Sequence, residues 1–170
     1  MIILINGSIN SGKSTVAKIL AEELSHSALV EIDVFHEMIE WMSIDQAVPL
    51  NLENAVSVIK NFVKYDIDVI VPYPLSEKNY QYMIDNLKDL NIPIHVFTLA
   101  PKLDKTLTNR GTRELTDQEK ERIKHHYNIG IPTPTFGEII DNTNQTPEET
   151  AKHILTKINE LQFGPKRSAV

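Results

Sequence analysis

The chain has 170 residues, a net charge of -6 and no cysteine. Its length suits one domain with a core of its own, and 41% hydrophobic with 24% charged residues is typical of water-soluble globular proteins. The negative charge disfavours nucleic acid or an anionic membrane as the main partner, and the lack of cysteine excludes disulfides and thiolate zinc sites. No apolar run reaches the ~18 residues of a membrane span, and no signal-peptide pattern is present, so we expect a cytoplasmic protein. The composition leaves monomer and homodimer open.

Apolar runs and amphipathic helical patterns alternate along the chain. The runs predict strands at Met1–Ile5, Ala28–Ile32, Ile67–Val71, Ile94–Leu99 and Ile139–Ile140. Helices are predicted from Lys13 to about Leu24, over Val34–Trp41, along apolar stripes within 52–63 and 80–90, and after the capping boxes that begin at Thr116 and Thr146. Strands alternating with helices predict an α/β fold, with a parallel sheet covered by helices on both faces. We expect a single domain over residues 1–162 and a flexible tail over 163–170.

The stretch Gly7–Thr15, GSINSGKST, matches the phosphate-binding pattern G-x-x-x-x-G-K-[ST]. Its glycines let backbone N–H groups curl around phosphates, its lysine neutralises the β- and γ-phosphates, and the hydroxyl after the lysine binds magnesium. A predicted strand precedes it and a predicted helix follows it, which is the context that this motif requires. We therefore predict that ATP binds through Gly7, Asn10, Ser11, Gly12, Lys13, Ser14 and Thr15. We expect Lys13 to face the solvent in the empty loop.

A P-loop, an acidic residue after the second predicted strand and a late arginine pair give the chain a resemblance to a known family. It resembles the small P-loop kinases, which include shikimate kinase, gluconate kinase and chloramphenicol phosphotransferase. The resemblance covers Met1 to about Leu161, and the stretches MIILING and EIDVFHEMIEWM are most similar to the chloramphenicol phosphotransferase branch. It implies the adenylate-kinase-like fold, with a five-stranded parallel sheet, a mobile lid and an acceptor site opposite the nucleotide. It also implies ATP and Mg²⁺.

Two acidic residues, Glu31 and Asp33, follow the second predicted strand, at the edge where open α/β sheets bind ligands. Alternation along a strand would place both side chains on the same side. Transfer to a hydroxyl needs a carboxylate that accepts its proton, so we predict Asp33 as the catalytic base and, with Ser14, as a magnesium ligand. A plain helix cap is the alternative for Asp33. The third predicted strand runs into Pro72 and lacks the aspartate that P-loop proteins often carry there. Either the acidic pair supports the metal alone or the chain is a degenerate nucleotide binder, and we favour the first because Lys13, Ser14 and Asp33 are all present.

The chain contains only four arginines. Arg110 and Arg113 flank Gly111, where the resembling kinases carry their lid. Guanidinium groups stabilise a transferring phosphoryl group, so we predict both as catalytic and Arg110 also as an ATP contact. Arg122, in the stretch DQEKERIKHH, fits an exposed charged helix face equally well. Asn142, after the fifth predicted strand, is predicted to border the adenine.

The segment between Lys18 and Lys60, which we expect to bind the acceptor, contains no lysine or arginine. Nucleotide kinases and shikimate kinase need cations there for the phosphate or carboxylate of their substrate, so both are disfavoured alternatives. We predict ATP-dependent phosphorylation of a small, non-anionic hydroxyl compound. The predicted substrate-binding residues are Glu31, Asp33, Phe35, His36, Trp41 and Tyr73, although Trp41 also fits a place in the core. A regulatory nucleotide-binding module and an NTP hydrolase without an organic acceptor remain as alternatives.

Overall fold

The computed structural model of the protein describes residues 1–109 and 114–163. It contains a five-stranded sheet in the order β2-β3-β1-β4-β5, in which every neighbouring pair of strands is parallel. The strands are β1 (Ile2–Gly7), β2 (Ser27–Leu29), β3 (Asp68–Pro72), β4 (Ile94–Leu99) and β5 (Glu138–Ile140). The prediction of a five-stranded parallel sheet is therefore confirmed.

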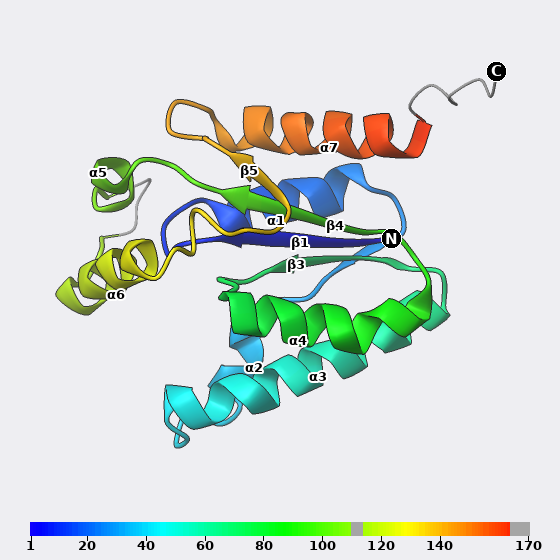
Figure 1. Ribbon diagram of the computed structural model, residues 1–170, viewed down its shortest axis with the longest axis horizontal. Coiled ribbons are helices and arrows are strands. Elements are labelled where there is room, and N and C mark those ends of the chain that lie inside the picture. Colours follow the sequence, from blue (N-terminus) through cyan, green and yellow to red (C-terminus); the bar gives the residue numbers. More distant parts are fainter. Residues whose placement is uncertain (110–113, 164–170) are drawn as a thin grey trace.

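Helices cover both faces of this sheet, as predicted. They are α1 (Lys13–Glu23), α2 (Asp33–Glu37), α3 (Ile44–Lys64), α4 (Glu77–Leu87), α5 (Leu103–Thr106), α6 (Asp117–Asn128), α7 (Pro147–Phe163) and the 3-10 helix η1 (Lys88–Leu90). Figure 1 shows α1 and α7 on one face, α3 and α4 on the other, and α5 and α6 beyond the arrowheads of the strands. In the described parts of the chain, no helix has the length and apolarity needed to cross a membrane.

Strand β1 lies at the centre of the sheet and is buried along its whole length. Ile2 and Leu4 belong to the hydrophobic cluster on the side of α3 and α4, whereas Ile3 and Ile5 belong to the cluster with α1 and α7. A strand that is covered on both faces needs apolar residues at consecutive positions, which explains the unbroken apolar run in the sequence. The strand ends at Gly7, so it delivers the P-loop to the carboxyl edge of the sheet.

Both predicted capping boxes are present. At α6 the backbone N–H of Glu119 donates to the Thr116 hydroxyl over 3.2 Å, and the Thr116 N–H donates to the Glu119 carboxylate over 3.0 Å. At α7 the same exchange joins Thr146 and Glu149, at 3.2 Å and 2.8 Å. These pairs fix where the two helices begin. Helix α7 extends to Phe163, and the rest of the predicted tail, 164–170, lies outside the described residues.

The segment after β2 differs from the prediction. The strand expected over Ala28–Ile32 ends at Leu29, and the next residues turn into a helix. Ile32 already has helical φ and ψ of -64° and -31°, and Asp33 is the first residue of α2. The expectation that strand alternation places Glu31 and Asp33 on the same side is therefore wrong, because neither residue lies in a strand.

The two helices that follow also have different bounds from those predicted. Helix α2 ends at Glu37 rather than at Trp41, and α3 begins at Ile44, well before the stripe that starts at residue 52. The stretch between them forms turns and bends. As a result, two additional turns at the start of α3 lie beside the segment that carries Asp33.

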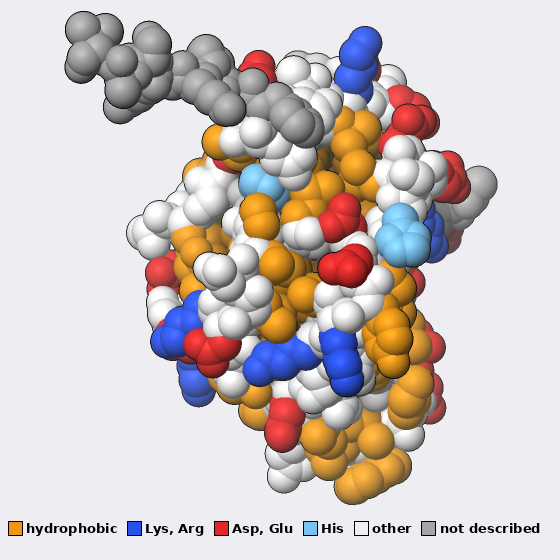
Figure 2. All heavy atoms as spheres, turned by 90° about the vertical axis from the view of Figure 1, so that its right-hand side faces the viewer, with side chains coloured by type: hydrophobic (Ala, Val, Ile, Leu, Met, Phe, Trp, Pro, Cys, Tyr) orange, Lys and Arg blue, Asp and Glu red, His pale blue; other side chains and the backbone are white. Residues whose placement is uncertain are grey.

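Figure 2 shows the end of the molecule on the right-hand side of Figure 1, where the chain begins. Acidic and basic side chains are interspersed there among hydrophobic ones. The amino group of Met1 forms an ion pair with Asp68 at the start of β3. The P-loop, α2 and α6 lie at the opposite end of the sheet (Figure 1), and the candidate site is found there.

Candidate active site

The loop between β1 and α1 has a backbone that few residue types can adopt. Gly7 has φ of 143°, and a Cβ atom at this position would lie 2.6 Å from the carbonyl oxygen of Leu99. Gly12 has φ of 98° at the N-cap of α1, and Asn10 has φ of 61°, a conformation that asparagine tolerates better than most residues. The free N–H groups at the start of α1 and the positive end of its dipole make this loop a suitable site for phosphate.

Lys13 folds back over the loop and is half-buried, so the expectation that it faces the solvent is wrong. Its Nζ donates a 2.7 Å hydrogen bond to the carbonyl oxygen of Ser8. Burial lowers the pKa of Lys13 from 10.5 to about 8, and the carboxylate of Asp33 partly opposes this shift. A phosphate beside Nζ would raise the pKa again, because it supplies the negative charge that the buried ammonium lacks.

Two predicted nucleotide contacts, Asn10 and Asn142, hold the loop itself. The amide of Asn142 is 3% exposed and donates a 3.0 Å hydrogen bond to the carbonyl oxygen of Ser11. The amide of Asn10 donates to the carbonyl oxygens of Thr106 and Thr108, over 2.8 Å and 2.9 Å. These bonds connect the P-loop to the ends of β5 and α5, and they shape the phosphate site from outside.

Asn6 supports the start of the loop from within the core, where it is fully buried. Its Nδ2 donates to the hydroxyl of Thr98 over 3.0 Å and to the carbonyl oxygen of Ile131 over 3.1 Å. Its Oδ1 accepts a 2.7 Å hydrogen bond from the backbone N–H of Leu75. One side chain therefore joins β1 to β4, to the segment after β3 and to the segment after α6. The sequence gives no motif that would have identified it.

A cavity of about 420 Å³ opens beside the P-loop, at the carboxyl edge of the sheet. Its walls come from the P-loop, α2, the first turns of α3, the segment after β3 and helix α6. It brings together six residues that were predicted from the sequence: Asn10, Lys13, Ser14, Asp33, His36 and Tyr73. The predicted phosphate-binding and acceptor-binding groups thus share one cavity.

Three residues predicted to bind the acceptor do not line this cavity: Glu31, Phe35 and Trp41. Glu31 is half-buried, and Phe35 packs against the hydrophobic cluster below the sheet. Trp41 is 80% exposed, so the alternative that it belongs to the core is wrong. It lies in the turn after α2, which the predicted longer helix would have included.

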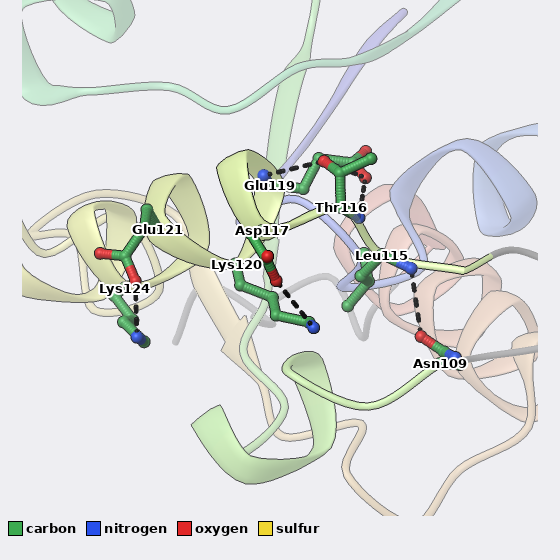
Figure 3. A network of polar contacts seen from close by, with 8 residues as sticks. All are labelled: Asn109, Leu115, Thr116, Asp117, Glu119, Lys120, Glu121 and Lys124. Atoms are coloured by element: carbon green, nitrogen blue, oxygen red, sulfur yellow. Dashed lines mark hydrogen bonds and ion pairs between the residues drawn. The ribbon is translucent and has the colours of Figure 1, made fainter.

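Helix α6 contributes Glu119 and Arg122 to the cavity. The sequence left Arg122 open between an exposed charged face and a functional role, and its place at the cavity favours the functional one. The predicted lid arginines, Arg110 and Arg113, lie outside the described residues. Figure 3 shows the start of α6 with its capping box, together with the surface ion pairs Asp117–Lys120 and Glu121–Lys124.

His126, also on α6, contacts the P-loop. The side chain is 7% exposed, and its Nδ1 lies 3.3 Å from the hydroxyl oxygen of Ser8. Burial, together with the positive charges of Lys13 and Arg122, lowers the pKa of His126 to about 4. The ring is therefore neutral near pH 7 and shares one hydrogen bond with the Ser8 hydroxyl. Sequence reasoning missed this contact, since the histidine stands in a stretch that resembles an ordinary charged helix.

Tyr73 forms part of the cavity next to the predicted base, and its side chain belongs to the core. Burial raises the pKa of Tyr73 to about 12, the negative charge of Asp33 acts in the same direction, and Arg122 opposes it. The hydroxyl therefore stays protonated at neutral pH. Asp33 affects the pKa values of both Tyr73 and Lys13, in accord with the cavity that all three residues line.

The donor set suits a magnesium ion that arrives with a nucleotide. Among the described residues, no group of three or more His, Asp or Glu side chains could hold a metal ion by itself. Ser14 and Asp33, however, line the same cavity. Magnesium usually takes one or two protein ligands at such sites and completes its shell with phosphate oxygens and water. A hydroxyl and one carboxylate therefore fit Mg²⁺ bound to ATP.

Searches against protein-family models and against curated proteins return no match for this sequence. Solved structures do match. The tunicamycin resistance protein of Deinococcus radiodurans has a TM-score of 0.64 and 21% identity, over 92% of this chain and 94% of that chain. A sugar kinase from Janibacter sp. gives 0.71 and 15%, over 93% and 94%. Shikimate kinase from Aquifex aeolicus gives 0.61 and 20%, over 97% and 100%. The chain therefore shares its fold with these proteins, two of which are named as kinases.

This similarity confirms the predicted fold class and the resemblance on which it rested. The matches extend over more than nine-tenths of the chain, so the sheet, its covering helices and the P-loop belong to one shared architecture. The predicted mobile lid stays a prediction, because its arginines lie outside the described residues. At these levels of identity the similarity establishes the fold, and the activity has to be argued from the site.

Proposed function

We propose that the protein is an ATP-dependent phosphotransferase that moves the γ-phosphoryl group to a hydroxyl of a small, non-anionic molecule. One observation carries this proposal: Lys13 and Ser14 of the P-loop line the same cavity as Asp33. Phosphoryl transfer to a hydroxyl needs a phosphate cradle and a carboxylate within reach of one acceptor. The fold shared with a sugar kinase and a shikimate kinase supports the same conclusion.

Each part of the cavity has a role in this reaction. The P-loop amides and Lys13 hold the β- and γ-phosphates, and Asp33 accepts the proton of the acceptor hydroxyl as its oxygen bonds to the γ-phosphorus. The bond from the γ-phosphorus to the bridging oxygen breaks, and ADP leaves. Arg122 faces the cavity and stabilises the negative charge of the transferring group. Ser14 and Asp33 would hold Mg²⁺, which would further neutralise the charge of the phosphates. Arg110 and Arg113 stay predicted contributors to the same step.

The charges around the acceptor position disfavour an anionic molecule. Among the described residues of α2 and α3 that line the cavity, two are acidic, Asp33 and Glu37, and none is a lysine or arginine. An anionic group about 4 Å from a carboxylate costs roughly 4 kcal/mol at an effective dielectric constant of 20, about a thousandfold in affinity. The two lysine or arginine residues that line the cavity in the described part of the chain, Lys13 and Arg122, are needed at the phosphates. An anionic acceptor would therefore lack a counter-charge.

A phosphorylation screen tests this proposal. The protein and Mg²⁺–ATP are incubated with uncharged compounds (D-glucose, thymidine and tunicamycin, the last suggested by the name of a structural neighbour) and with the anions shikimate, gluconate and thymidine monophosphate. We expect phosphorylated product, detected by mass spectrometry, from the uncharged set. Asp33→Asn should lower turnover by about 100-fold or more, while ATP still binds through the P-loop, whereas Glu37→Gln, in the same helix, should keep the wild-type rate within a few-fold.

The alternatives give different results in this screen. ADP formation that no acceptor stimulates would identify an NTP hydrolase. ATP binding without turnover would identify a regulatory nucleotide-binding module. Efficient phosphorylation of any of the three anions would disprove the non-anionic acceptor class, and equal turnover of wild type and Asp33→Asn would return Asp33 to the role of a helix cap.

A further inference from the structure

One face of α3 lines the acceptor side of the cavity. Ile44, Ala47, Val48 and Asn51 are spaced by three and four residues, and all four border the cavity. This spacing places them in one row along the helix. The same row continues to Ala55, which is fully buried in the core. Asn51 therefore stands where the row passes from the cavity into the protein interior.

The side chain of Asn51 is an amide whose oxygen lacks a partner. It is 4% exposed, and its Oδ1 is buried without a hydrogen bond from the described residues. Buried polar atoms without a partner destabilise a folded protein, and asparagine is also a poor helix former. Leucine has the same branched shape without polar atoms and would suit this helix position better. The amide thus lowers stability at a wall of the cavity, which is a common property of ligand-binding residues.

A second polar group lies in the same cavity. His36 follows Asp33 by one turn of α2, and its Nδ1 is buried without a hydrogen bond from the described residues. The acceptor side therefore combines two carboxylates, an imidazole and an amide with the apolar side chains of Ile44 and Val48. Such a mixture of apolar walls and a few polar groups is typical of sites for small organic molecules.

We propose that the side-chain amide of Asn51 binds a second polar group of the acceptor, distinct from the hydroxyl that is phosphorylated. The inference rests on the proposed function and names its substrate class: an uncharged molecule with a hydrogen-bonding group besides that hydroxyl and an apolar part against Ile44 and Val48. An amide can donate and accept without requiring a charged partner. A half-turn of its terminal torsion brings either Oδ1 or Nδ2 to the cavity wall, since that torsion is broad.

The first measurement separates this role from a structural one. Asn51→Leu removes the amide whose Oδ1 has no partner among the described residues, and Asn54→Leu makes the same change at an exposed position of the same helix, away from the cavity. We expect Asn51→Leu to raise the melting temperature by about 2–4 °C, more than Asn54→Leu does. A melting temperature clearly below that of the wild type, with Asn54→Leu unaffected, would show that the amide supports the fold and would overturn the inference.

The second measurement is the acceptor KM, with D-glucose, thymidine and tunicamycin as the uncharged probes. Asn51→Leu and Asn51→Ala, which adds no bulk, should both raise the acceptor KM about tenfold or more, the usual effect of one lost hydrogen bond in a buried site. The KM for ATP should stay unchanged, and Asn54→Leu should behave as wild type. An unchanged acceptor KM in both variants would overturn this inference alone. Failure of the wild type to phosphorylate any uncharged probe would overturn the proposed function and this inference with it.

Discussion

His126 makes the stability of the protein depend on pH, and its burial determines that stability falls as the pH is lowered. Its pKa is about 4 in the folded protein, against 6.5 for an ordinary histidine. Between these two values the unfolded chain binds a proton that the folded protein does not, so acidification favours unfolding. The effect is absent above pH 6.5 and grows as the pH falls toward 4. At ~1.4 kcal/mol for each pH unit, it amounts to about 3 kcal/mol at most.

A variant without the titrating ring tests this reasoning. His126→Gln keeps a hydrogen-bonding group near Ser8 but cannot gain a proton, and the neighbouring His125→Gln changes an exposed histidine of the same helix. Free energies of unfolding are measured by urea titration at pH 7 and at pH 4.5. Wild type and His125→Gln should lose about 2 kcal/mol more than His126→Gln between these pH values. An equal loss in all three proteins would refute the assigned pKa and its cause.

Three further predictions concern the cavity. Gly7→Ala should lower the free energy of unfolding by about 2 kcal/mol or more, because its Cβ would lie 2.6 Å from a carbonyl oxygen of β4. Gly12→Ala, whose Cβ would meet nothing closer than 3.8 Å, should lose about half as much, and equal losses would contradict the steric argument. Arg122→Ala should lower kcat about 100-fold and leave the melting temperature unchanged. Lys124→Ala, on the same helix, should change neither quantity. A normal kcat in Arg122→Ala would assign Arg122 to the solvated face of the helix. Lys13→Ala should abolish ATP binding in calorimetry while circular dichroism stays unchanged, and wild-type ATP affinity would disprove the phosphate site.

The sequence allowed the sheet and the P-loop to be predicted because both depend on neighbouring residues. The strand Met1–Ile5 is one continuous apolar run, and a buried parallel strand needs such a run. The phosphate loop is complete within Gly7–Thr15, so its glycine spacing and its lysine could be recognised without knowledge of the rest of the chain. The two capping boxes were predictable for the same reason, since donor and acceptor stand three residues apart.

The acceptor wall could be predicted only in part. The apolar stripe predicted a helix only from residue 52 onward, whereas α3 begins at Ile44 and includes Pro49, although proline in a helix interior is disfavoured. The spacing of Ile44, Ala47, Val48 and Asn51 was nevertheless a usable signal, because it continues the periodicity of the later stripe.

Contacts between residues that are far apart in the sequence could not be predicted from local sequence patterns. His126 and Ser8 are 118 positions apart, and they meet because α6 packs against the P-loop. The same holds for Arg122, whose neighbours in the sequence describe an exposed helix while its position in the fold places it at the cavity. Folding brings such residues together through tertiary packing, which periodicity and motif spacing do not encode.

The buried amide of Asn6 has a consequence for how the site comes apart. Its donor and acceptor atoms are all engaged, with partners in β4, in the segment after β3 and in the segment after α6. Detaching any one of these segments leaves a polar atom of Asn6 unsatisfied in a dry core, and that penalty falls on the other two as well. The nucleotide loop and the two segments behind it therefore open as one cooperative unit rather than fraying separately.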